Sequence, residues 1–141
     1  MSEANRGKVA EGKVKDKLRK MEAGNCAHMR MPDTHAGSRV PTLADFIFCK
    51  EGTLTLLEVK ETKLPNRLPY ANVDKAQVAK MRMWKAAGAS AWVITYHSTL
   101  DRWRFFGVEY FLSRNPEKPS GSWEISEVPT YTLDEIFGFI T

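Results

Sequence analysis

Three ionisable residues, Asp45, Glu58 and Lys60, have a spacing that would gather them on one face of a β-hairpin. A tight two-residue turn at Glu51-Gly52 would set Asp45 opposite Glu58, and Lys60 would share that face because side chains alternate along a strand. Directly opposed residues lie about 5 Å apart at Cβ, so the two carboxylates would repel each other. A hard divalent cation such as Mg²⁺, which prefers carboxylate and water oxygens, would neutralise the pair.

A metal held in this way could deprotonate or orient a water molecule and stabilise the negative charge that builds up on phosphate oxygens. Lys60, a compact cation, would hold the attacking water or the scissile phosphate. The predicted chemistry is therefore metal-dependent phosphodiester hydrolysis. The alternative is that Glu58 and Lys60 are ordinary polar positions on a solvated strand face, since a bare E-x-K tripeptide is common by chance.

The elements that would position these groups follow from the hydrophobic pattern. The apolar runs Phe46–Cys49 and Thr53–Leu57 flank Lys50-Glu51-Gly52 and predict the two strands of the hairpin, with Lys50 facing Thr53. Residues 7–21 predict a helix, whose apolar stripe is formed by Ala10, Val14, Leu18 and Met21. Glu11 lies at the edge of that stripe. A carboxylate there needs a partner, either the metal site or a neighbouring lysine.

The segment after Lys63 is predicted to be an irregular, mobile loop over residues 64–71, which contain two prolines. A helix is predicted over Val73–Ala87, with Asn72 as its N-cap and Gly88 as its stop. Gln77 falls on the same stripe as Met81 and Trp84, so its amide is expected against the sheet. The carboxylates of the metal site, or their waters, are its expected partners.

The last third of the chain predicts further strands at 91–96, 102–106 and 123–128. Trp92, Trp103 and Phe105 are expected in the core. Thr132 and Glu135 have the spacing of a capping box that opens a final helix. The apolar side of that helix consists of Ile136, Phe137 and Ile140.

In its motifs and their order, the chain resembles the PD-(D/E)xK nuclease superfamily, and within it the Holliday junction resolvases of the RecU type and, more distantly, of the archaeal Hjc type. The matching segments are Asn5-Arg6-Gly7 with Glu11, Ala44-Asp45-Phe46, Glu58 to Lys63, Leu68-Pro69 with Asn72 and Gln77, and Ala91 to Tyr96. The resemblance implies an α/β fold with a restriction-endonuclease-like core, in which helices flank a central mixed β-sheet.

The resemblance also implies the roles of individual residues. Asp45, Glu58, Val59 and Glu11 would bind the metal, Lys60 would assist the attacking water, and Gln77 would support the site. The expected metal is Mg²⁺, with Mn²⁺ able to substitute.

Two features depart from the family pattern. Ala44 stands where such enzymes often have proline or threonine, and the stretch from Cys26 to Leu43 is much shorter than the RecU-type stalk insertion. The second departure makes junction selectivity less secure than hydrolysis. Pro32-Asp33 is a less suitable catalytic pair because no apolar strand follows it at once. His35 and Ser38 are expected in a polar loop that could approach the substrate.

Positive charge is concentrated in the part of the chain that carries the proposed site. Residues 1–85 contain 17 basic and 10 acidic side chains, whereas residues 86–141 contain 4 and 7. Lysine and arginine contact DNA phosphates without reading sequence. The candidates for such contacts are Arg6, Lys13, Lys17, Arg30, Arg39, Lys63, Arg67 and Lys75.

Length and composition predict a single nuclease domain over residues 1–141, with 43% apolar residues to build its core. No apolar run approaches the length of a membrane span and no signal peptide is recognisable, so a cytoplasmic protein is expected, in a bacterium or a phage-infected cell. Cys26 and Cys49 are expected to be reduced thiols. No P-loop, dinucleotide-binding motif or zinc cluster is present.

These patterns predict an endonuclease that resolves four-way DNA junctions by paired incision. Because such a junction is nearly two-fold symmetric, a homodimer is expected. Two alternatives stay open. One is another nuclease on the same core, such as a nicking, flap or restriction-type enzyme. The other is a noncatalytic DNA-binding protein that keeps the nuclease fold.

Overall fold

The computed structural model describes residues 3–32, 42–114 and 121–141, with side chains from residue 9 onward. Its centre is a five-stranded sheet in the order β1-β2-β3-β5-β6. These strands are β1 Cys26–Arg30, β2 Phe46–Lys50, β3 Thr53–Thr62, β5 Ser90–His97 and β6 Arg102–Gly107. β3 and β5 run parallel, and the other neighbours are antiparallel. The sheet is therefore mixed, as predicted.

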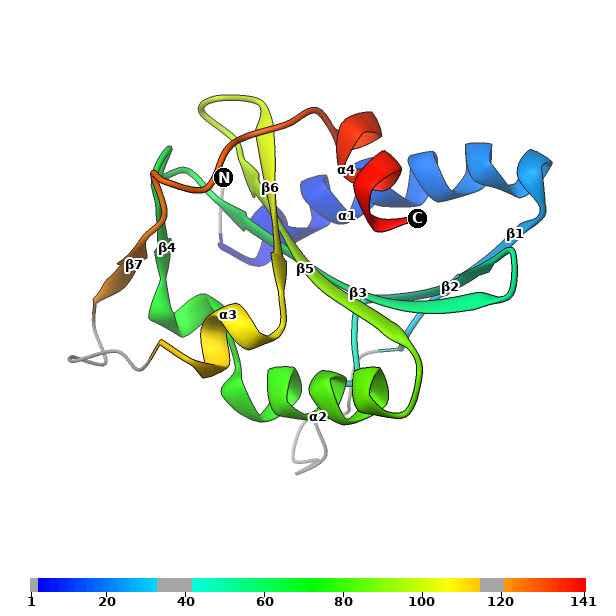
Figure 1. The fold of residues 1–141 in the computed structure, drawn as a ribbon. Coiled ribbons are helices and arrows are strands. Elements are labelled where there is room, and N and C mark those ends of the chain that lie inside the picture. Colours follow the sequence, from blue (N-terminus) through cyan, green and yellow to red (C-terminus); the bar gives the residue numbers. More distant parts are fainter. Residues whose placement is uncertain (1–2, 33–41, 115–120) are drawn as a thin grey trace.

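Helices cover both faces of this sheet (Figure 1). Helices α1 (Glu3–Met21) and α4 (Leu133–Ile140) lie on one face, and α2 (Lys75–Ala86) and α3 (Glu109–Leu112) lie on the other. Each face has its own core. Ala10, Val14 and Leu18 of α1 pack with Phe46, Leu57 and Val59, whereas Val78 and Met81 of α2 pack with Leu56, Val93 and Phe106. The alternation along β3 therefore divides its side chains between two helical layers.

Several sequence predictions are confirmed. Trp92, Trp103 and Phe105 belong to or pack against the core under α1 and α4. The capping box of Thr132 and Glu135 is formed, and Ile136, Phe137 and Ile140 are buried. The two cysteines are free thiols.

Other predictions need correction. Residues 64–71 are not simply irregular, because β4 (Arg67–Pro69) pairs with β7 (Ser122–Glu124) in a separate two-stranded sheet. The predicted strand over 123–128 is thus short and lies outside the main sheet. A 3-10 turn at Tyr70–Asn72 follows β4. Asp74, not Asn72, caps α2, because its carboxylate accepts the N–H groups of Ala76 and Gln77.

The first helix begins at Glu3, four residues earlier than predicted. Trp84 was expected on the buried stripe of α2, but 41% of it is exposed. It lies one turn beyond Met81, near the end of the helix. Pro32 is described, whereas Asp33, His35, Ser38 and Arg39 lie outside the described residues.

Candidate active site

The β2–β3 hairpin has the register that the sequence predicted. Lys50 pairs with Thr53 and Phe46 pairs with Leu57, so Asp45 comes next to Glu58 at the open end of the ribbon. The turn residues Glu51 and Gly52 both have positive φ, at 52° and 82°. Positive φ at both positions matches a type I′ turn, which fits the twist of a two-residue hairpin.

The two carboxylates are held by the backbone of each other's strand. The N–H of Asp45 donates to Glu58 Oε1 at 3.0 Å, and the N–H of Val59 donates to Asp45 Oδ2 at 2.8 Å. Glu58 is 3% exposed. These reciprocal bonds fix both acids in place before any substrate binds.

Lys60 joins the same cluster. Its Nζ lies 2.8 Å from Glu58 Oε2, and the Lys60 side chain is 21% exposed compared with 4% for that of Glu58. The ammonium therefore sits on the solvent side of the buried carboxylate. It partly neutralises Glu58 and remains accessible to a bound phosphate.

The charge balance of the site fits a divalent cation. Burial and the nearby charge of Glu58 raise the pKa of Asp45 to about 7, in spite of the Val59 N–H and the Lys60 charge. The positive charge and the hydrogen-bond donors around Asp45 and Glu58 are thus too few to neutralise both carboxylates. Within residues 3–32, 42–114 and 121–141, no three His, Cys, Asp or Glu residues are grouped to hold an ion. Two carboxylates completed by water and substrate oxygens are a typical Mg²⁺ arrangement.

Of the predicted metal ligands, Val59 could contribute only main-chain atoms, because its side chain packs in the core beneath α1. Asp45 and Glu58 are the residues that would hold the ion. A bound ion would supply Lewis-acid activation of the phosphate and of a water molecule.

The raised pKa of Asp45 predicts how metal-free stability depends on pH. The folded pKa lies above the ordinary aspartate value of 3.8, so the contribution of Asp45 to stability is fully present at low pH and is lost as pH rises through about 7. We expect the Tm without metal to fall by several degrees between about pH 5 and pH 8, and Mg²⁺ to recover most of that loss at the higher pH. Thermal unfolding in EDTA and in Mg²⁺ would measure this. A pH slope of the same size in Asp45→Asn would contradict it.

Glu11 reaches the site from α1. Burial and, to a smaller extent, the nearby charge of Asp45 raise the pKa of Glu11, while Arg30 opposes both. Arg30 Nη2 lies 3.1 Å from Glu11 Oε2. Glu11 thus lies close to Asp45, as the resemblance implied. It also forms an ion pair, but its partner is an arginine of β1 and not a neighbouring lysine.

Gln77 is buried, but its contact differs from the prediction. Its Nε2 donates to the main-chain oxygen of Thr42 at 3.0 Å, and no bond from it to Asp45 or Glu58 is found among the described residues. Thr42 precedes Asp45 by three residues. Gln77 therefore supports the site indirectly, by fixing the segment that leads into β2.

Gln77→Leu is expected to lower the free energy of unfolding by about 1 to 2 kcal/mol, because the half-buried Thr42 carbonyl loses its donor. Cleavage should fall less than about tenfold, because Asp45 keeps its own bonds to β3. Urea unfolding and cleavage rates would measure the two effects. Arg82→Leu, at an exposed position of the same helix, is the control. A loss of cleavage as complete as that of Asp45→Asn would mean that Gln77 acts directly.

The predicted DNA contacts fall into two groups. Lys13, Lys63 and Arg67 are exposed, although Arg67 also donates to the side-chain and main-chain oxygens of Ser122. Lys17 forms an ion pair with Asp134 at 3.0 Å, Arg30 pairs with Glu11, and Lys75 is half-buried and has a partner, so these three are engaged within the protein. The side chain of Arg6 and all of Arg39 lie outside the described residues.

Sequence reasoning missed two contacts near the site. Glu61, next to Lys60, accepts the N–H of Ala10 on its Oε1 at 3.0 Å and so ties β3 to the helix that carries Glu11. The Ala10–Glu61 contact has no local sequence signal, because its partners lie 51 residues apart.

On the opposite face of the sheet, Arg104 Nη1 lies 3.0 Å from His97 Nε2, and both side chains are buried. Arg104 also donates to the main-chain oxygens of Pro65 and Val128, which fixes the segment after β3. His97 and Arg104 are only seven residues apart, on the two strands of the β5–β6 hairpin.

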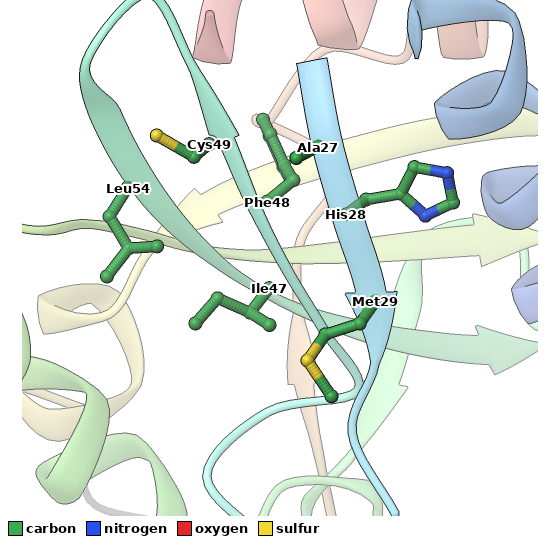
Figure 2. Close-up of a pocket in the computed structure, with 7 residues that line it drawn as sticks. All are labelled: Ala27, His28, Met29, Ile47, Phe48, Cys49 and Leu54. Carbon is green, nitrogen blue, oxygen red and sulfur yellow. The ribbon is translucent and has the colours of Figure 1, made fainter.

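A shallow apolar pocket lies apart from these ionisable groups (Figure 2). It is formed on the β1–β2–β3 side of the sheet by Ala27, His28, Met29, Ile47, Phe48, Cys49 and Leu54. None of the predicted metal ligands lines it. Its lining gives no acid, base or metal ligand other than His28, whose ring pairs with Glu22, and the free thiol of Cys49.

Comparison with known proteins identifies the fold. No protein-family model and no curated protein matches the sequence. Among solved structures, the chain is similar to Hjc, a Holliday junction resolvase from the archaeal hyperthermophile Archaeoglobus fulgidus, with a TM-score of 0.59 and 22% identity over 87% of this chain and 95% of that one. It is also similar to the bacterial homing endonuclease I-Ssp6803I, with a TM-score of 0.49 and 18% identity over 93% of this chain and 75% of that one.

The similarity to Hjc, together with the mixed sheet and its flanking helices, shows that the chain has the restriction-endonuclease-like fold that Hjc has. The fold predicted from the sequence is thereby confirmed. In the part of the chain that the structure describes, no helix combines the length and apolarity that crossing a bilayer requires.

Proposed function

We propose that this protein is a Mg²⁺-dependent endodeoxyribonuclease that resolves four-way DNA junctions by paired phosphodiester hydrolysis. The observation that carries the proposal is the buried Asp45–Glu58 pair, locked by reciprocal backbone bonds and flanked by Lys60. A DNA-binding role alone would not need a costly cluster of this kind.

In the proposed reaction, Asp45 and Glu58 hold the metal, with Glu11 as a further carboxylate close by. Lys60 orients the attacking water or binds the scissile phosphate. Gln77 holds the segment before Asp45. Exposed cations, including Lys13, Lys63 and Arg67, would bind phosphates along the DNA arms.

Junction cleavage would need two active sites related by two-fold symmetry, so we further propose a homodimer. Residues 1–141 would form one nuclease domain in each subunit, acting in the cytoplasm of a bacterium or of a phage-infected cell. Mn²⁺ is expected to replace Mg²⁺, because both accept oxygen ligands in octahedral sites.

A substrate comparison tests the proposal. A synthetic four-way junction, a flap and a linear duplex of matched sequence would each be incubated with the protein and Mg²⁺. Symmetric nicks on the junction, with little cutting of the duplex, are the expected result. Preferential cutting of the flap or duplex would favour another nuclease of this fold, and binding without any metal-dependent cutting would favour a noncatalytic DNA-binding protein.

A further inference from the structure

The strands β1 and β2 and the helix α1 meet beside Asp45, where Arg30 of β1 forms an ion pair with Glu11 of α1. β1 runs alongside β2, and its extension continues past Arg30, since the N–H of Met31 donates to the Asp45 main-chain oxygen at 2.8 Å. Helix α1 packs against β1 and β3 (Figure 1), and its Glu11 pairs with Arg30 of β1. Arg30 and Glu11 therefore face each other immediately next to the proposed metal ligand.

The Arg30 guanidinium holds the Glu11 carboxylate with two nitrogens. Its Nε donates to Oε2 at 3.1 Å and its Nη2 donates to Oε1 at 3.3 Å. A third nitrogen, Nη1, donates to the main-chain oxygen of Met31 at 2.8 Å. Such a planar fork fixes the orientation of the carboxylate as well as neutralising it.

Each member of the pair also suits a different partner in the proposed reaction. The guanidinium fork matches a phosphate group as well as it matches a carboxylate, and 35% of the Arg30 side chain is exposed. Glu11 lies beside Asp45, because its partner Arg30 directly precedes Met31, whose N–H donates to the Asp45 main-chain oxygen. One phosphate and one cation would therefore separate the pair by satisfying both members at once.

We propose that the Arg30–Glu11 ion pair is a resting contact that a DNA phosphate opens, taking the guanidinium and releasing the Glu11 carboxylate towards the metal beside Asp45. This inference rests on the proposed nuclease function. Arg30 is then a positioning residue, which couples the arrival of substrate to completion of the acidic site. DNA without metal has to compete with Glu11 for Arg30, and metal without DNA has to compete with Arg30 for Glu11. By linkage, each ligand strengthens the binding of the other by the same factor.

A double-mutant cycle in EDTA tests the DNA half of this coupling without any metal. Binding of a fluorescent four-way junction by anisotropy would be compared for the unaltered protein, Glu11→Gln, Arg30→Gln and the double variant. Glu11→Gln should tighten binding by about fivefold or more, within the usual range of coupling factors, and this gain should disappear in the Arg30→Gln background. In an Arg30→Lys background, which keeps the charge but loses the guanidinium fork, Glu11→Gln should also lose most of its effect on DNA binding.

Asp16→Asn is the matched control, because it removes one acidic charge from the exposed side of α1. It should change binding less than about twofold. An equal gain from Glu11→Gln with and without Arg30, or no gain at all, would overturn the proposal. Absence of DNA binding by the unaltered protein would overturn the proposed function itself.

The effect of Arg30 on metal binding can be measured separately from DNA binding. Titration with Mn²⁺ without DNA, followed by calorimetry or electron paramagnetic resonance, should show tighter binding in Arg30→Gln than in the unaltered protein, but only while Glu11 is present. If Arg30→Gln also tightened Mn²⁺ binding in the Glu11→Gln background, the effect would reflect a general loss of positive charge and would contradict the coupling. Far-ultraviolet circular dichroism of each variant would exclude misfolding as the cause of a change.

Discussion

Asp45→Asn is expected to lower the rate of metal-dependent DNA cleavage by roughly 10³-fold, because a ligand that stabilises the metal contributes several kcal/mol to the transition state. Asparagine has nearly the same shape, and its side-chain oxygen can still accept the Val59 N–H that Asp45 Oδ2 accepts at 2.8 Å. The fold should therefore be kept. The substitution also removes a buried group whose pKa is raised to about 7, so the metal-free variant should unfold at a higher temperature above neutral pH.

Single-turnover cleavage of a junction at saturating protein would measure this loss, and anisotropy would verify that DNA binding is retained. Asp16→Asn, on the exposed side of α1, is the control for the removal of one acidic charge. A variant that keeps more than about a tenth of the cleavage rate would place the metal elsewhere.

Lys60→Met is expected to slow cleavage by roughly 10²-fold or more, within the range for a residue that positions or deprotonates the nucleophile. The methionine keeps much of the apolar stem but removes the ammonium that lies 2.8 Å from Glu58 Oε2. Because Glu58 then loses a competing partner, Mn²⁺ binding should stay the same or become tighter. This combination of slow cleavage with intact metal binding distinguishes Lys60 from the two carboxylates.

Cleavage rates and Mn²⁺ titration of the same preparations would measure both effects. Lys63→Met, at an exposed position just after β3, is the matched control and should affect DNA binding more than the chemical step. Loss of Mn²⁺ binding in Lys60→Met would mean that the lysine mainly maintains the structure of the pair.

The hairpin could be predicted from the sequence because its information is local. Two residues with positive φ at Glu51 and Gly52 fix the register, and the register brings Asp45 next to Glu58 without reference to the rest of the chain. The buried stripe of Ala10, Val14 and Leu18 on α1 could likewise be predicted from the spacing of neighbouring residues alone. The family resemblance supplied the mixed sheet with its flanking helices and the approach of Glu11 to the predicted metal site.

The contacts that escaped prediction join distant segments. Gln77 was expected to meet the acids because a buried amide needs partners, but the Thr42 carbonyl, 35 residues away in sequence, provides one. Arg30 was treated as a DNA contact, and nothing in the sequence indicated that it would pair with Glu11 across 19 residues. The pairing of β4 with β7 likewise joins strands 55 residues apart, as in the bond from Arg67 to Ser122.

The central claim, that Asp45 and Glu58 share one metal ion, is tested most directly by anomalous diffraction from crystals soaked in Mn²⁺. A single strong peak between the two carboxylates, absent from Asp45→Asn crystals prepared in the same way, is the predicted result. A peak at another place, or no peak beside Asp45 and Glu58 at a Mn²⁺ concentration that supports DNA cleavage, would contradict the account.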